Sequence, residues 1–272
     1  MNLKELCVKI ELQDEMARAV EDFSAEFDFS TVDEQIARLV DPDCSADART
    51  ALETAVGDDP KGVKILSCYL RAALITREKY DELGIDEKIY IDTMKCFPRF
   101  IGETLERNDL LAFQTAYWSY RHLNTTLVRI GTLEYERKVR EGVKVLSIHI
   151  PSNADLSQET LDRSVADARK FMREKFPEYG EAPMICESWL LSERLRDFLG
   201  ENSKILKFQA MFDIQRQNAP SKNALTYIFH RANCDDYASL PENTSLQRKV
   251  KAFLLAGGGI GSGYGVVKND GR

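Results

Sequence analysis

Apolar residues in the first 125 positions recur every three or four residues, which is the spacing of amphipathic helices. A Thr31-x-x-Glu34 capping box predicts one helix start, and Gly57 and Gly84 predict helix ends. Helices are therefore expected in succession over 1–10, 31–41, 45–56, 60–75, 76–83, 86–96, 98–107 and 108–122. The pattern predicts an all-helical N-terminal domain over residues 1–125.

The pattern changes after Leu127, where alternating residues predict strands over 132–139, 143–151 and 183–189. Within the second of these, Leu146, Ile148 and Ile150 share one face, and Ser147 and His149 share the other. Later strands are expected over 204–215, 225–231 and 263–267, and helices over 157–176, 192–199 and 244–257. This order predicts an α+β protein of two domains, the second being a mixed-sheet α/β domain over residues 126–272.

Charge and composition exclude several classes of function. The net charge of −7 disfavours a nucleic-acid partner, and no run of 18 apolar residues predicts a membrane span. Six scattered cysteines without a CxxC pair, in a chain of this size, indicate a reducing cytoplasm. Three histidines, none at ligand spacing to a cysteine, predict no metal site. We expect a cytoplasmic protein with a small-molecule ligand; its oligomeric state is left open.

Five phrases carry a resemblance to a known family: YWSYRHLNTTLVRIGTLEYE (117–136), SIHIP (147–151), CESWLLSERLRDFL (186–199), NSKILKFQAMFDI (202–214) and NTSLQRKVKAFLLAGGG (243–259). They resemble a group of acyltransferase-like proteins that join a helical N-terminal domain to a GNAT-like C-terminal domain. The resemblance implies transfer of an acyl group from acyl-CoA to an amine of a small molecule or protein. It also implies that the pantetheine arm lies between splayed strands 143–151 and 183–189.

The same resemblance implies that the pyrophosphate binds at the start of helix 157–176, where backbone amides and the helix dipole attract anions. The residues implied in binding acyl-CoA are Ile150, Pro151, Ser152, Asn153, Leu156, Ser157 and Gln158. This turn lacks the spaced glycines and the Arg or Gln of the usual GNAT loop. Asp155 and Glu159 would repel phosphate by about 1 kcal/mol per close exposed pair. An alternative is therefore a catalytically inactive GNAT-like sensor of CoA or another anionic ligand.

Four residues are candidates for the chemistry. His149, at the end of its strand, could act as a general base, although a strand histidine can also be a hydrogen-bonded core residue. Cys186 and Ser188 share a face of the next strand, and Cys186 could be a nucleophile if His149 faces the same side. Buried free cysteines are nevertheless common. Glu134 could act as a base through water, or belong to a solvated strand face shared with Glu136.

Two further patterns bear on the mechanism. The usual GNAT general acid, a tyrosine after the second splayed strand, has no counterpart in SERLRDFL (192–199). The glycine-rich stretch AGGGIGSGYG (256–265) follows a predicted helix, whereas a dinucleotide loop follows a strand. We interpret it as a helix end and a turn into the last strand.

Overall fold

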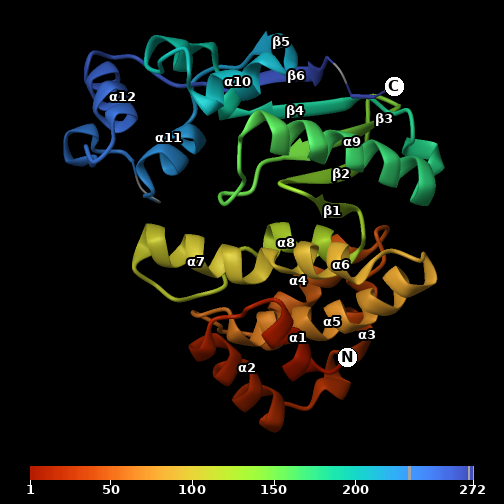
Figure 1. The fold of residues 1–272 in the computed structure, drawn as a ribbon. Helices are drawn as coiled ribbons and strands as arrows, with labels where there is room; N and C mark the ends of the chain where they lie inside the picture. The colour runs from red at the N-terminus through yellow and green to blue at the C-terminus, as the bar shows by residue number, and fades with distance from the viewer. Residues whose placement is uncertain (232–233, 269, 272) are drawn as a thin grey trace. The chain divides into compact units, whose positions relative to one another are not determined.

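The computed structural model describes residues 1–231, 234–268 and 270–271. Residues Met1–Ile130 and Gly131–Arg272 form two compact units, which are described separately (Figure 1). The first unit contains α1 (Leu3–Lys9), α2 (Asp14–Glu26), η1 (Phe29–Thr31), α3 (Asp33–Arg38), α4 (Ser45–Val56), α5 (Val63–Glu82), α6 (Glu87–Met94), α7 (Cys96–Asn108), α8 (Ala116–Leu123) and β1 (Leu127–Ile130).

Helix α5 is the central element of this first unit, and it packs against α1, α2, α3, α4, α6 and α8. Tyr69 is fully buried in it and donates a hydrogen bond to the Ala116 carbonyl in α8 at 3.1 Å. Thr76 is also buried and donates to the Leu123 carbonyl at 2.7 Å. Because buried polar groups are stable only when hydrogen-bonded, these contacts fix α8 against α5.

Three details of the predicted helices are wrong. The helix expected over 108–122 is reduced to α8, which begins at Ala116. The segments 60–75 and 76–83 form the single helix α5, because its core-facing residues continue in phase to Tyr80. The Thr31 capping box is absent: Thr31 ends η1 and its hydroxyl donates to the Asp28 carbonyl, so α3 begins at Asp33. The predicted end of α4 is confirmed, and Gly57 adopts the positive φ of 65° that glycine tolerates best.

The second unit is built around a mixed sheet (Figure 1). Its strands are β2 (Leu133–Arg140), β3 (Val143–His149), β4 (Met184–Ser188), β5 (Phe212–Gln217) and β6 (Gly263–Val267). They lie in the order β2-β3-β4-β6-β5, and the pairing of β3 with β4 is parallel whereas the others are antiparallel. The helical elements are α9 (Gln158–Lys175), η2 (Pro177–Tyr179), η3 (Trp189–Leu191), η4 (Glu193–Asp197), α10 (Lys204–Ala210), α11 (Lys222–Phe229), η5 (Tyr237–Ser239) and α12 (Ser245–Leu255).

Helix α9 packs on one face of this sheet through a stripe of buried residues that includes Leu161, Val165 and Met172. The Tyr135 hydroxyl of β2 lies 3.0 Å from the Ser164 hydroxyl of α9, which identifies the covered face. Because side chains alternate along a strand, Glu134 and Glu136 belong to the opposite face.

Three predicted elements in this unit are wrong. Residues 204–210 form α10 and leave only 212–217 as strand β5, and residues 222–229 form α11 instead of a strand. In α11, Ala224, Leu225, Ile228 and Phe229 lie on one helical face and pack with α12 in a separate hydrophobic cluster. Tertiary packing thus overrides the strand propensity of their aromatic and β-branched residues. The helix expected over 192–199 is the short η4.

Candidate functional site

The hydrogen-bonding register shows that β3 and β4 separate partway along their length. In their parallel ladder Leu146 is paired with Met184, and Ser147 is paired with Ile185. Past these pairs both strands continue, β3 paired with β2 as far as His149 and β4 paired with β6 as far as Ser188. The β3–β4 ladder therefore ends at Ser147 and Ile185, and the facing backbone groups of the two strands beyond it border a stretch that we call the opening. An extended amide-containing chain could pair with these groups.

His149 lies at the end of β3, beside this opening and on the sheet face opposite α9. Its Nε2 lies 2.9 Å from Glu136 Oε2 in β2, and the two side chains are 22% and 8% exposed. Glu134 is opposite His149 in the register and is also buried. When Nε2 carries the proton donated to Glu136, Nδ1 carries the imidazole lone pair. The sequence indicated His149 and Glu134, but it did not reveal that Glu136 is the hydrogen-bond partner.

The segment between β3 and α9 makes a turn in which the Ala154 amide donates to the Pro151 carbonyl at 2.9 Å. Ile150, Leu156 and Ser157 are half-buried and Pro151 is buried, whereas Ser152, Asn153 and Gln158 are exposed. Ser157 is the N-cap residue of α9, and its side chain caps no backbone amide of that helix. Its hydroxyl instead contacts Asp155 and Thr160, both at 2.8 Å. The first turn of α9 therefore offers backbone amides to a ligand.

Asp155 was expected to repel phosphate, but the structure supplies a cation that compensates its charge. Lys204 at the start of α10 places Nζ 2.9 Å from Asp155 Oδ1. The hydrogen bond from Lys204, followed by those from the Ser157 hydroxyl and amide, lowers the pKa of this carboxyl far below its usual value. The ion pair leaves the turn close to neutral, and this reduces the repulsion expected from the sequence.

A small cavity of about 200 Å³ lies beside the first turn of α9. Its lining includes Gln158 from α9, Lys207 from α10 and Lys268 just after β6. The Lys268 ammonium donates to the Ala210 carbonyl at 3.0 Å. The lining also includes Asp162, which accepts a hydrogen bond from Gln158 at 2.8 Å. Two lysines against one carboxylate leave a net positive charge beside the start of α9, which favours phosphate binding. Neither lysine is identifiable from a local motif, because the three elements meet only in the folded unit.

Cys186 and Ser188 lie on the other face of the sheet from His149. Ser147 is paired with Ile185, so Ile185 and Glu187 share the face of His149, whereas Cys186 shares that of Leu146. Cys186 is fully buried, and its burial raises the pKa of the thiol well above its usual range. The Ser188 hydroxyl accepts the Leu190 amide hydrogen at 3.2 Å. The condition for activating Cys186, a shared face with His149, is not met.

Burial also protects other cysteines, which gives a direct chemical test. Burial raises the pKa of Cys7 to about 11 and that of Cys68 to about 12, so the native protein keeps both thiols protonated at pH 8. We expect iodoacetamide at pH 8 to modify the half-exposed Cys44 first and to leave Cys7, Cys68 and Cys186 unmodified until the protein is unfolded, as read by peptide mass spectrometry. Rapid native labelling of Cys186 would contradict its burial.

The same raised pKa values predict how stability depends on alkaline pH. The unfolded chain releases these thiol protons near the ordinary value of 9.0, whereas the folded chain retains them. The folded state therefore binds more protons above this pH, and the free energy of unfolding falls as the pH rises from about 9 to about 11.

Among the described residues, no group of three or more His, Cys, Asp or Glu side chains is arranged to hold a metal ion. Within the same residues, none of the helices combines the length and the apolar character needed to cross a bilayer.

Comparison with known proteins agrees with this architecture. Residues 1–125 match the family model of an N-acyltransferase N-terminal domain, and residues 127–267 match that of a GNAT-like C-terminal domain. The chain therefore belongs to the acyltransferase family that joins these two domains. No curated protein sequence gave a match.

Solved structures with the same fold include an acyltransferase in complex with decanoyl-CoA and teicoplanin, which is 20% identical with a TM-score of 0.80 over 97% of this chain and 86% of that one. A structure of an acyltransferase with decanoyl-CoA gives 19% identity and a TM-score of 0.80 over 97% and 86% of the two chains. A third, in complex with CoA and 10C-teicoplanin, gives 19% identity and a TM-score of 0.72 over 98% and 99%. At these identities the similarity establishes the fold.

Proposed function

We propose that this protein transfers an acyl group from acyl-CoA to an amine. The observation that carries the proposal is the separation of β3 from β4 directly beside the His149–Glu136 pair. Membership of an acyltransferase family and the acyl-CoA complexes of structures with the same fold support the choice of co-substrate. We assign the chemistry to a functional domain over residues 126–272, and we treat residues 1–125 as the helical domain.

In this proposal His149 is the general base. With Nε2–H donated to Glu136, Nδ1 accepts a proton from the amine as its nitrogen attacks the thioester carbonyl. The new N–C bond forms, the C–S bond breaks, and the CoA thiolate leaves and takes up a proton from solvent. Glu136 fixes the orientation of the ring, and the buried carboxylates of Glu134 and Glu136 favour the imidazolium that forms during transfer.

The acyl-CoA would bind along the opening and the turn that follows it. The pantetheine amides would pair with the backbone of β3 and β4 past Ser147 and Ile185, with Ile150 and Pro151 at the end of the opening. Ser152, Asn153, Leu156, Ser157 and Gln158 surround the exposed first turn of α9, which would bind the pyrophosphate. Lys207 and Lys268 would bind the remaining phosphate charge, and Lys204 would offset Asp155.

Isothermal titration calorimetry of the full chain tests the co-substrate. We expect octanoyl-CoA and decanoyl-CoA to bind, and the double substitution Lys207→Glu and Lys268→Glu to weaken binding by at least about tenfold, because two phosphate-binding cations become anions. The weakening should diminish as the salt concentration rises. Lys170→Glu on the exposed surface of α9 is the matched control and should leave the affinity unchanged. No heat with acetyl-, octanoyl- or decanoyl-CoA would overturn the proposal.

A further inference from the structure

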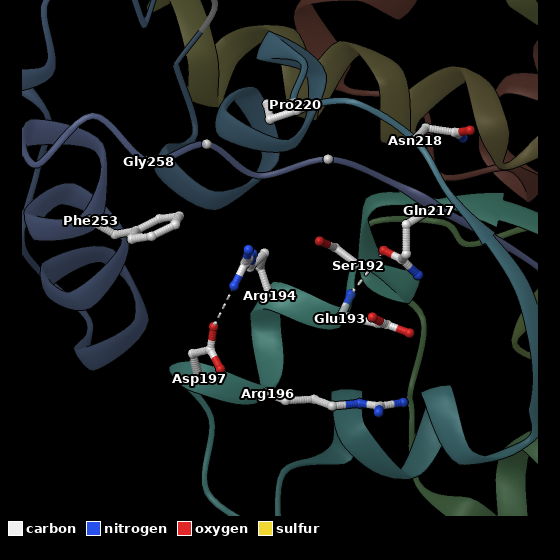
Figure 2. Close-up of a pocket in the computed structure, with 12 residues that line it drawn as sticks. Ser192, Glu193, Arg194, Arg196, Asp197, Gln217, Asn218, Pro220, Phe253 and Gly258 are labelled. Atoms are coloured by element: carbon white, nitrogen blue, oxygen red, sulfur yellow. Dashed lines mark hydrogen bonds and ion pairs between the residues drawn. The ribbon is translucent and has the colours of Figure 1, made fainter.

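A larger cavity of about 670 Å³ lies within the second unit, beyond the ends of β4 and β5 (Figure 2). One wall is η4, a second is the segment that leaves β5 at Gln217 and Asn218, and a third is the glycine-rich return from α12 at 258–261. Its volume lies in the range that encloses small molecules. No step of the mechanism above uses these residues.

The cavity lies at the end of the sheet where His149 also lies. Ser188 is paired with Gly263, and Gly263 is paired with Gln217, so the end of β4 leads across β6 to the cavity wall. Glu187 shares the face of His149. Its carboxylate accepts a hydrogen bond from the side-chain Nδ2 of Asn218 at 2.9 Å. A molecule in the cavity therefore lies at the end of the sheet where β3 and β4 separate.

Hydrogen bonds and close packing hold the walls of the cavity. Gln209 is 2% exposed and donates to the Leu190 and Ser192 carbonyls, both at 2.9 Å, while its oxygen accepts a hydrogen bond from Arg196 Nε at 3.2 Å. This fixes one edge of the guanidinium and leaves its terminal nitrogens to act as a fork for an anion. On the opposite wall a Cβ at Gly259 would lie 2.6 Å from Pro220, so only glycine fits there without a shift of its neighbour.

The lining of the cavity carries charges of both signs. The acid Glu193 lies on the sheet side, where its backbone amide donates to the Gln217 side chain at 3.1 Å. Arg194 lies farther out, opposite Phe253, and forms an exposed ion pair with Asp197 at 3.6 Å (Figure 2). Glu193 and Arg196 extend to the same side of η4, away from the Arg194–Asp197 pair (Figure 2), so these two side chains match a molecule with a cationic amine and an anionic group close together.

We propose that this cavity binds the acceptor, and that the acceptor is a zwitterion of the amino-acid or short-peptide class. Its ammonium group is attracted by Glu193, and its carboxylate is held by Arg196 beside it. This inference rests on the proposed acyl transfer and adds the class of acceptor to it.

The test compares two acceptors that differ only in the carboxylate, alanyl-alanine and alanyl-alanine amide, with the full chain and decanoyl-CoA. Release of the CoA thiol gives kcat/KM for each. We expect the acid to exceed the amide by at least about tenfold, and Arg196→Gln to bring this ratio close to one. Arg196→Lys keeps the charge without the fork and should give an intermediate ratio. Arg248→Gln, on exposed α12 outside the cavity, should keep the wild-type ratio.

Calorimetry with decanoyl-CoA separates failure of this inference from failure of the transfer proposal. If decanoyl-CoA binds but the acid and the amide react equally, or neither reacts, the zwitterionic acceptor is wrong while the co-substrate assignment stands. If decanoyl-CoA does not bind, both proposals fail. Circular dichroism and thermal unfolding check that Arg196→Gln is folded. If the folded variant keeps the tenfold preference for the acid, Arg196 does not bind the carboxylate and the assignment of this cavity is overturned.

Discussion

Replacing His149 with glutamine is expected to lower kcat for acyl transfer by at least about a hundredfold while acyl-CoA affinity changes little. General bases of this kind contribute about 10² to 10⁴ in rate. Glutamine keeps a hydrogen-bond donor toward Glu136 but cannot accept the proton of the attacking amine. The measurement is single-turnover release of CoA thiol at saturating acyl-CoA, with affinity determined separately by calorimetry.

Two variants make this result specific. Glu136→Gln keeps a hydrogen-bond acceptor 2.9 Å from His149 but removes the negative charge, so its loss of kcat should be smaller than that of His149→Gln. His230→Asn is a matched control at the left-handed C-cap of α11, a conformation that asparagine tolerates, and should keep wild-type kcat. Wild-type turnover by His149→Gln would show that another group accepts the proton. Acyl-CoA binding without turnover in the unsubstituted protein would favour the sensor function instead.

Much of the fold could be predicted because the local pattern and the tertiary packing agree. In β2, β3 and β4 the alternation of apolar residues survives into the structure, and β6 has the expected bounds of 263–267. The pattern failed at 204–210 and 222–229, where aromatic and β-branched residues suggested strands. There the apolar faces pack at helical spacing against other helices, and no local signal reveals that contact.

The site could be predicted only in part, because the residue pattern of one strand does not reveal which residues of the neighbouring strands pair with it. Alternation placed His149 on the polar face of its strand and Glu134 and Glu136 on the polar face of theirs. Only the pairing of β2 with β3 shows that Glu136 contacts His149, and only the pairing of β3 with β4 shows that Cys186 lies on the other face. Likewise, Lys204 neutralises Asp155 across 49 positions of sequence, a contact that the turn residues do not indicate.

The largest loss of stability is expected for Arg169→Met in α9. Arg169 is 2% exposed, and its Nη2 lies 3.0 Å from the Asp270 carboxylate, which is equally buried. Its other nitrogens donate to the carbonyls of Asp270, Gly180 and Ala182 at 2.7 to 2.9 Å. Methionine fills a similar volume but leaves a buried carboxylate and three carbonyls without this donor. Removing one partner of a buried ion pair typically lowers the free energy of unfolding by about 3–5 kcal/mol.

Arg173→Met is the matched control, because Arg173 lies one turn later in α9 and its partners are exposed: it pairs with Glu181 at 2.7 Å and donates to the Gly271 carbonyl at 2.8 Å. Water replaces the lost partner there, so little change is expected. Both variants are compared by urea unfolding in a Trp118→Phe background, where Trp189 is the remaining tryptophan and reports on the second unit. If Arg169→Met and Arg173→Met shift the urea midpoint equally, the buried ion pair does not stabilise this unit. A selective shift for Arg169→Met instead shows that the buried contact of Asp270 with α9 stabilises this unit.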